Sequence, residues 1–206
     1  METLRYTLVA DGSSDRALIP IITWALRQQS IMVALQAEWA DLSRLPRRPQ
    51  RLDERIAEAL NLYPCELLCI HRDAERELPD HRRTEINAAL VAVAKKRDQM
   101  PPALCMIPVR IQEAWLLFDE AAIRAAAGNP NGKIALDLPQ VARVERLPDP
   151  KETLRQLLRL ASGLNGHRLQ QFDDRPQRVL PAFAAFEAEL RDLAVAQGWN
   201  KVVNEE

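Results

Sequence analysis

Short apolar runs alternate with amphipathic stretches along the first part of the chain. The first run, residues 6–10, is rich in β-branched and aromatic side chains, which is typical of a buried strand. It ends in Asp11-Gly12, a tight-turn dipeptide. Residues 15–29 then place apolar side chains at helical spacing, with one face formed by Leu18, Ile21, Ile22 and Leu26. The opening therefore predicts a strand, a turn and a helix.

The same alternation continues further along the chain. Strand-like runs are expected at residues 31–35, 66–70 and 104–109, and helical patterns at residues 52–62, 84–97 and 113–127. Strands that alternate with helices favour parallel pairing through right-handed crossovers, with helices on both faces. The pattern predicts an α/β fold with a mostly parallel four-stranded sheet, in which the first and third strands are neighbours or near-neighbours.

We expect this α/β domain to cover residues 1–127 and a helical C-terminal appendage, packed on the core, to cover residues 128–206. Residues 133–150 are irregular and rich in proline, whereas residues 151–160 and 180–196 have amphipathic helical patterns. The loop at residues 128–133 resembles a phosphate-binding loop. It has one residue too few between its glycines, and Ile134 stands where a magnesium-binding hydroxyl is needed.

The composition says more about where the protein is located than about which reaction it performs. The 206 residues are 47% hydrophobic with a formal net charge of −1, so any contact with a polyanion must come from local patches. No signal peptide and no apolar run of about 20 residues is visible in the sequence, which predicts a cytoplasmic protein outside the membrane. The three cysteines lie in or beside apolar runs, as expected for buried reduced thiols rather than a zinc site.

Acidic side chains follow two of the expected strands. Asp11 comes directly after the first strand, and Asp73 and Glu75 come shortly after the strand that ends at Ile70. The carboxyl ends of parallel strands share one edge of a sheet, where ligands bind. Three carboxylates there could hold Mg²⁺ or Mn²⁺. As alternatives, Asp11 could only close the turn at Gly12, and the other two could favour a helix N-terminus.

Further candidates lie near the same edge. Glu113 follows the fourth strand and could be a ligand or a base, or a helix-opening residue beside the positive end of the dipole. His71 could shuttle a proton or serve as a hydrogen-bonded structural histidine. Arg72 and Arg110 could clamp a phosphate, or form surface ion pairs.

A basic loop is the best candidate for contact with a nucleic-acid backbone. It covers residues 44–51 and includes Arg47 and Arg48. Because Asp53 and Glu54 follow at once, the alternative is a solvated loop with no ligand.

Together these motifs resemble the Toprim domain of topoisomerases, primases and OLD-type nucleases. The resemblance covers about residues 4–160 and depends on the Asp11-Gly12-x-x-Asp15 turn and on Asp73-x-Glu75. The block at residues 109–119, with Glu113-Ala114-Trp115, and the later residues 149–151 are similar to small stand-alone Toprim-like proteins. Members of that family are often encoded beside an ABC-type ATPase in what look like phage-defence loci.

The resemblance implies a function and a site. It makes Asp11 the counterpart of the Toprim glutamate, and Asp73 and Glu75 the counterpart of its Asp-x-Asp metal pair, with one side chain a methylene shorter and another a methylene longer than usual. It implies a Mg²⁺- or Mn²⁺-dependent nuclease, acting on DNA in preference to RNA, with an ATPase as a partner. The alternatives are a degenerate adaptor that binds the ATPase, and a metal-dependent small-molecule phosphohydrolase.

One expectation concerns association. Apolar side chains recur along the last helical pattern, and this stripe looks wider than a small appendage can bury. We therefore expect part of it to serve a homodimer or a docked ATPase. The stripe consists of Leu180, Phe183, Phe186, Leu190 and Leu193.

Overall fold

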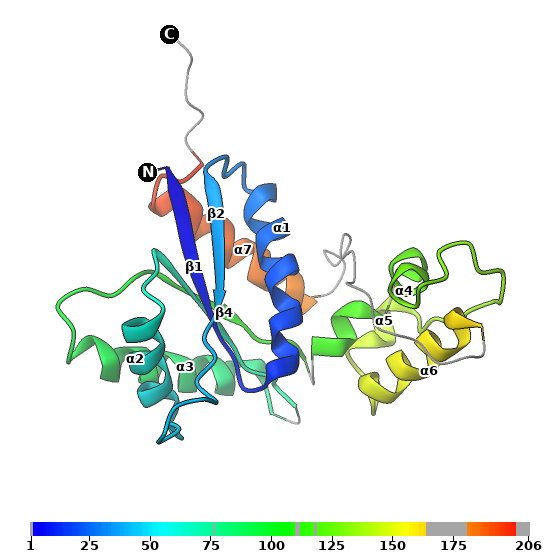
Figure 1. Cartoon of the computed structure of the whole chain (residues 1–206), viewed down its shortest axis with the longest axis horizontal. Helices are drawn as coiled ribbons and strands as arrows, with labels where there is room; N and C mark the ends of the chain where they lie inside the picture. Colours follow the sequence, from blue (N-terminus) through cyan, green and yellow to red (C-terminus); the bar gives the residue numbers. More distant parts are fainter. Residues whose placement is uncertain (1, 76, 110–111, 118, 164–180, 201–206) are drawn as a thin grey trace, which may run out of the picture. The chain divides into compact units, whose positions relative to one another are not determined.

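The computed structural model describes residues 2–75, 77–109, 112–117, 119–163 and 181–200 (Figure 1). The chain divides into two compact units. The first contains residues 1–72, 78–107 and 186–206, and the second contains residues 73–77 and 108–185.

A parallel sheet forms the centre of the first unit. Its strands are β1 (Thr3–Val9), β2 (Ala34–Trp39), β3 (Leu67–His71) and β4 (Ala103–Met106). They lie in the order β2-β1-β3-β4, and every pair is parallel. The expected four-stranded sheet is confirmed, and so is the adjacency of the first and third strands.

Helices cover both faces of this sheet. The 3₁₀ helix η1 (Ser13–Ala17) leads into α1 (Leu18–Gln28), while α2 (Leu52–Leu62) packs against α3 (Pro79–Ala94). Successive residues of β1 point to opposite faces. The Tyr6 hydroxyl donates to the Ile19 carbonyl in α1 at 3.0 Å, whereas the next residue, Thr7, donates to the Tyr63 carbonyl at the end of α2 at 2.9 Å. Helices α1 and α2 therefore lie on opposite faces of the sheet.

The amphipathic patterns predict the core well. In α1 the buried residues include the four apolar positions expected from the sequence, and in α2 Ile56 and Leu60 are buried as expected. Strand β3 is buried at every position, including His71 at its end, as its almost wholly apolar sequence indicates.

Two elements of the first unit differ from expectation. The second strand was expected at residues 31–35 but begins at Ala34. The carbonyl oxygens of Ile31 and Val33, before it, instead accept hydrogen bonds from the guanidinium of Arg27 in the last turn of α1. Helix α3 begins at Pro79 rather than residue 84, since proline is favoured in the first helical turn.

The second unit is largely helical. It contains the 3₁₀ helix η2 (Gln112–Leu116) and the helices α4 (Glu120–Ala126), α5 (Val141–Val144) and α6 (Pro150–Ser162). The single helix expected over residues 113–127 is wrong. Asp119 separates η2 from α4, because its backbone is extended and its side chain accepts the Ala122 N–H at 3.0 Å as an N-cap. The short helix α5 lies in a region expected to be irregular.

Helix α7 (Pro181–Ala196) carries the apolar stripe of which part was expected to be available to a partner. Phe183, Phe186 and Leu190 are instead buried within the chain, and Leu193 is half-buried. Leu180 lies outside the described residues. The centre of the stripe is therefore covered, and the availability of part of it to a partner stays a prediction.

Glu189 of α7 closes the free edge of β4. One carboxylate oxygen accepts the Cys105 N–H at 3.1 Å, and the other pairs with Arg83 of α3 at 2.6 Å. An edge strand presents unpaired N–H groups, so this side chain satisfies a donor that the sheet leaves open.

The three cysteines form no disulfide, and Cys69 and Cys105 are buried. Burial, reinforced by the charge of Glu189, raises the pKa of the Cys105 thiol to about 11. Across the residues that the structure describes, no helix combines the length and the apolar character needed to cross a membrane.

Replacing Glu189 with alanine should lower the free energy of unfolding by about 1–2 kcal/mol, because the Cys105 N–H then loses its acceptor. Urea denaturation measures this change. The exposed Asp192→Ala on the same helix is the matched control and should stay within about 0.5 kcal/mol of the wild type. An equal effect of both substitutions would show that Glu189 does not fasten the edge of β4.

Candidate functional site

The carboxyl ends of β1 and β3 lie side by side at one edge of the sheet. The two strands are parallel neighbours, and their register pairs Val9, the last residue of β1, with Ile70. Asp11 follows β1 by two positions, and His71 is the last residue of β3. This edge is where open α/β sheets bind ligands.

A buried carboxylate fixes the turn after β1. Asp15 reaches back from η1, and its Oδ2 accepts the Gly12 N–H at 2.9 Å. The same oxygen lies 3.3 Å from Nδ1 of His71, and Ser14 donates to Oδ1 at 3.2 Å. Both Asp15 and His71 are almost fully buried. His71 therefore has the hydrogen-bonded structural setting that was one of its two expected roles.

The surroundings of Asp15 favour its ionised form. Burial raises the pKa of this carboxyl, but the hydrogen bond and charge of His71, together with hydrogen bonds from Gly12 and Ser14, outweigh that effect. The pKa of Asp15 therefore lies below its ordinary value.

Asp11 lies between two guanidinium groups. Arg55 of α2 donates from Nη1 to Oδ1 of Asp11 at 2.6 Å, and its Nη2 bonds to the Ala10 carbonyl. On the other side, Nε of Arg72 lies 2.8 Å from Oδ2. The Arg55 and Arg72 side chains are only 15% and 17% exposed, whereas that of Asp11 is 46% exposed. The arginines are thus the more rigidly enclosed partners.

Arg72 connects Asp11 to α3. Its Nη1 donates to Oε1 of Glu85 at 2.7 Å, while Arg82 donates to Oε2 of the same carboxylate at 3.0 Å. Burial raises the pKa of Glu85, and the charges and hydrogen bonds of Arg82 and Arg72 outweigh it, so the net shift is downward. The cluster is a chain of alternating charges.

A cavity of about 550 Å³ opens over this cluster. Its size is in the range of small-molecule sites. Small side chains of α3, Ala88, Ala89 and Ala92, form part of its lining. The charged side chains that line it are Asp11, Arg51, Asp53, Arg55, Arg72 and Glu85. The lining therefore holds three arginines and three carboxylates, and Arg82, which is not part of it, pairs with Glu85 at 3.0 Å.

Asp73 and Glu75 belong to the second unit, in the segment of residues 73–77. The backbone of this segment is not extended at Glu75, whose φ of 55° lies in the left-handed region. Ala74 between them is buried, and its N–H donates to the Pro108 carbonyl at 3.0 Å. Asp73 is half-buried and Glu75 is exposed.

Glu113 also belongs to the second unit, in η2. Its carboxylate lies 3.6 Å from Nζ of Lys151 at the start of α6, and its side chain is 15% exposed. Asp149 caps α6 by accepting the Glu152 N–H at 2.9 Å. The two sequence blocks around Glu113 and residues 149–151 therefore meet in the folded chain.

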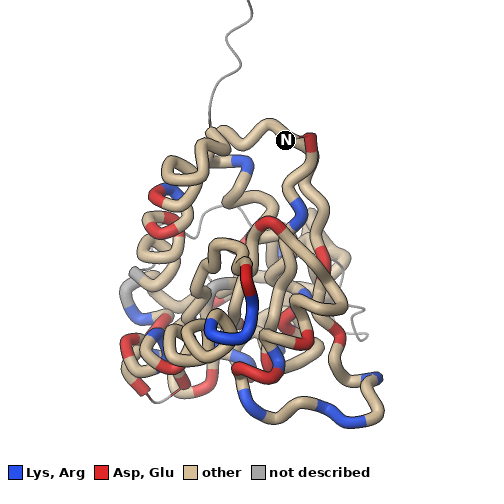
Figure 2. The backbone as a smooth tube through the Cα atoms, turned by 90° about the vertical axis from the view of Figure 1, so that its left-hand side faces the viewer, with Lys and Arg blue, Asp and Glu red and all other residues tan. Residues whose placement is uncertain are grey.

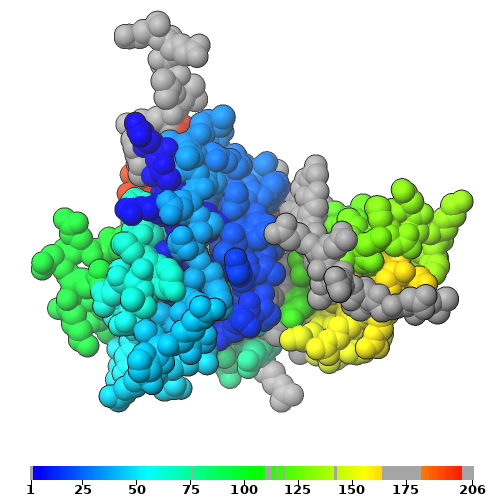
Figure 3. All heavy atoms as spheres, in the orientation of Figure 1, coloured from blue at the N-terminus to red at the C-terminus, as the bar shows by residue number. Residues whose placement is uncertain are grey.

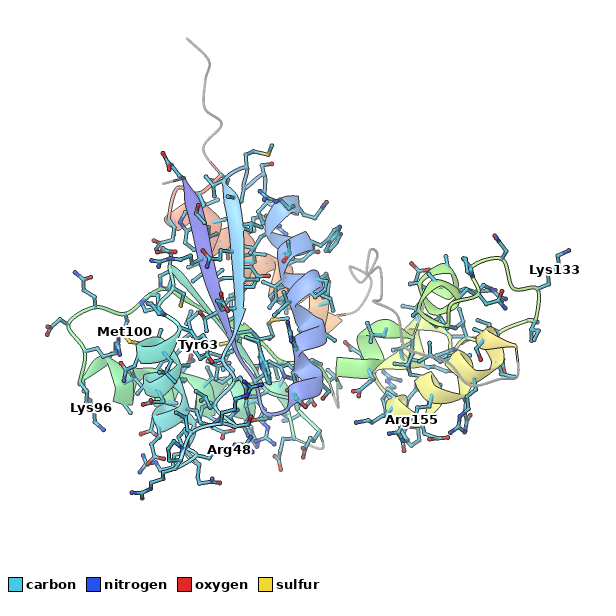
Figure 4. The ribbon with its side chains drawn as sticks, in the orientation of Figure 1. Arg48, Tyr63, Lys96, Met100, Lys133 and Arg155 are labelled. Carbon is cyan, nitrogen blue, oxygen red and sulfur yellow. The ribbon has the colours of Figure 1, made fainter. Side chains whose placement is uncertain are left out.

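The remaining basic candidates have different settings. Arg47 and Arg48 are exposed in the loop before α2, where Figure 4 labels Arg48. Arg110 lies outside the described residues. Figure 3 shows α2 and this loop at the surface, and Figure 2 shows basic residues interspersed with acidic ones along the chain.

The structure was also compared with the ligand set that a divalent cation needs. Within the described ranges, no group of three His, Cys, Asp or Glu side chains is placed to hold a metal ion. Each oxygen of Asp11 already faces a guanidinium. Within either unit, therefore, the described carboxylates do not form a cation site.

Sequence reasoning missed three residues of the cluster. Arg55 and Glu85 lie on helices whose pattern shows which face is apolar but not which polar side chain meets the turn after β1. Asp15 was expected to mark the start of a helix, and the Asp-Gly-x-x-Asp spacing was the available signal for its hydrogen bond to Gly12.

Comparisons of the chain with protein-family models, with curated proteins and with solved structures found no match.

The depressed pKa of Asp15 predicts how stability depends on acid. A carboxyl whose pKa is lowered on folding stabilises the protein above its unfolded pKa, and this contribution is lost as the pH falls through the folded value. Wild-type stability should therefore fall below about pH 4, and Asp15→Asn should flatten that decrease. Urea unfolding at pH values from about 2.5 to about 6, which bracket the ordinary pKa of an aspartate, measures this dependence of stability on pH.

The matched control is Asp98→Asn, which removes an exposed carboxyl far from the turn in sequence. It should keep the wild-type dependence on pH. An acid profile of Asp15→Asn that parallels the wild type would mean that the buried carboxyl does not stabilise the fold.

Proposed function

We propose that the chain is a divalent-metal-dependent nuclease that hydrolyses phosphodiester bonds, acting on DNA in preference to RNA in the cytoplasm. The observation that carries this proposal is the guanidinium pair at the carboxyl edge of the sheet. Arg55 and Arg72 flank Asp11 in an open cavity, and guanidinium groups recognise phosphate oxygens with paired hydrogen bonds.

The protein groups would bind and orient the substrate. Two enclosed arginines can hold a phosphate in one orientation and offset the negative charge that develops on it during hydrolysis. Arg51, which is exposed at the rim and paired with Asp53 at 3.0 Å, would contact a neighbouring phosphate. Arg47 and Arg48 would extend this contact along the backbone of the nucleic acid.

The cation enters this proposal through the sequence resemblance. Asp11, Asp73, Glu75 and Glu113 remain its proposed ligands or bases, and Mg²⁺ or Mn²⁺ would activate water for attack on the phosphate. Because the described carboxylates do not form a cation site, we derive no reaction step through the metal. The resemblance to Toprim domains is likewise a proposal.

A second candidate function is a non-catalytic adaptor. Both oxygens of Asp11 are compensated by arginines, which is what a carboxylate with a purely structural role would show. In that case the Toprim-like domain would bind a partner such as an ABC-type ATPase without cleaving nucleic acid. The buried side chains at the centre of the α7 stripe would not supply this contact.

Asp73→Asn separates these functions. The substitution is nearly isosteric at a half-buried position, so the thermal unfolding midpoint should change little. If Asp73 is a metal ligand, cleavage of plasmid and single-stranded DNA with Mn²⁺ should fall by about 100-fold or more, since even outer-shell partners of metal ligands cost 10- to 100-fold. Asp98→Asn is the control for loss of one carboxylate.

Equal cleavage by the wild type and Asp73→Asn would remove Asp73 from the mechanism. Absence of divalent-dependent cleavage in the wild type itself would favour the adaptor.

Asp11→Glu tests the other acidic position. The longer side chain restores the residue type of Toprim domains, so cleavage should be preserved or should rise if Asp11 is a ligand or a base. If Asp11 only closes the turn beside Gly12, the longer side chain should cost about 1 kcal/mol of stability with no catalytic gain. Cleavage assays with parallel thermal unfolding distinguish these outcomes.

A further inference from the structure

The guanidinium pair around Asp11 is arranged unequally. Arg55 makes a well-directed hydrogen bond to Asp11 at 2.6 Å. Nε of Arg72 is buried and lies 2.8 Å from the other carboxylate oxygen, yet it makes no hydrogen bond with any of the described residues. The contact is therefore an ion pair without a well-directed hydrogen bond.

The fork of Arg72 is also divided between two partners. Its Nε faces Asp11 and its Nη1 donates to Glu85 at 2.7 Å, whereas a guanidinium fork binds best to two oxygens of one oxyanion. Asp11 supplies one oxygen to each arginine. A planar carboxylate cannot offer paired oxygens to two guanidinium groups at once.

A phosphate group would fit the two guanidinium groups better than the Asp11 carboxylate does. Its tetrahedral oxygens can accept from two guanidinium groups on different sides, and once Asp11 has moved away the lining keeps three arginines and two carboxylates. The side chain of Asp11 is 46% exposed and lies in the turn after β1, outside the strand, so it can move without disturbing the sheet. Arg55 and Arg72 are held more tightly and would stay in place.

We propose that Asp11 occupies a phosphate-binding site, and that a phosphate group of a nucleic-acid strand displaces its carboxylate from Arg55 and Arg72. In this exchange the arginines bind the ligand and Asp11 is released from its ion pairs. The carboxylate becomes available for chemistry only when substrate is present. The identity of the ligand rests on the proposed function, whereas the exchange itself requires no cleavage.

The size of the cavity is consistent with this ligand. About 550 Å³ is enough for a nucleotide, and the alanines of α3 leave that space open because they lack longer side chains. The site would therefore take a terminal or unpaired nucleotide of a single strand more readily than a stacked base pair.

Binding in the absence of divalent cations tests the exchange. The probes are inorganic phosphate, followed by ³¹P NMR, and a single-stranded oligonucleotide of about ten nucleotides in 5′-phosphorylated and 5′-hydroxyl forms, followed by fluorescence anisotropy in EDTA. Asp11→Asn should bind phosphate and the oligonucleotide about tenfold more tightly than the wild type, because it removes a competing charge.

Arg55→Gln should weaken the same binding by about tenfold or more, since it removes one arm of the site. Arg155→Gln is the matched control, because it makes the same change of charge on α6 in the second unit, where Figure 4 labels Arg155. It should bind phosphate as the wild type does. Thermal unfolding verifies that each variant is folded.

Weaker or unchanged binding by Asp11→Asn would overturn the exchange, and so would wild-type affinity in Arg55→Gln. A preference for the 5′-phosphorylated strand assigns the site to an end group, and equal affinity for both strands assigns it to an internal phosphodiester. Because EDTA prevents metal-dependent cleavage, these outcomes are independent of the nuclease assay. Tight binding in EDTA, together with no cleavage of the same strand when Mn²⁺ is supplied, would support the exchange and contradict the proposed nuclease.

Discussion

The first unit depends on the parallel pairing of β1 with both β2 and β3. This pairing buries β1 in the middle of the sheet and brings the carboxyl ends of β1 and β3 to one edge. The backbone must then turn sharply after Val9, and Asp15 stabilises that turn by accepting the Gly12 N–H and by contacting His71 of β3. The turn is thus anchored to the neighbouring strand, and the position of Asp11 follows from it.

Arginines compensate the negative charge of Asp11 at this edge of the sheet. Asp11 is 46% exposed beyond the end of β1, and it is paired twice, with Arg55 from α2 and with Arg72 after β3. The same arginines make the cavity attractive to an anion. One cluster can therefore serve both structure and binding, because the two arginines that pair with Asp11 in the free protein can also bind a phosphate.

The sequence predicted correctly the features that depend on the local spacing of apolar residues. Helix α2 has the expected bounds, Leu52–Leu62, and the apolar face of α1 was correctly predicted, because a stripe at helical spacing has one way to be buried. The start of β2 was wrong because an edge strand is exposed at alternate positions, so its hydrophobic signal is weak. The break at Asp119 and the role of Arg55 depend on a side-chain cap and on tertiary packing, which periodicity does not encode.

The most direct test of this account is a crystal structure with Mn²⁺ and a 5′-phosphorylated oligonucleotide. The account predicts a phosphate with oxygens about 3 Å from the guanidinium groups of both Arg55 and Arg72, and Asp11 turned away from them. A structure in which the oligonucleotide binds elsewhere, while Asp11 keeps both ion pairs, would contradict it.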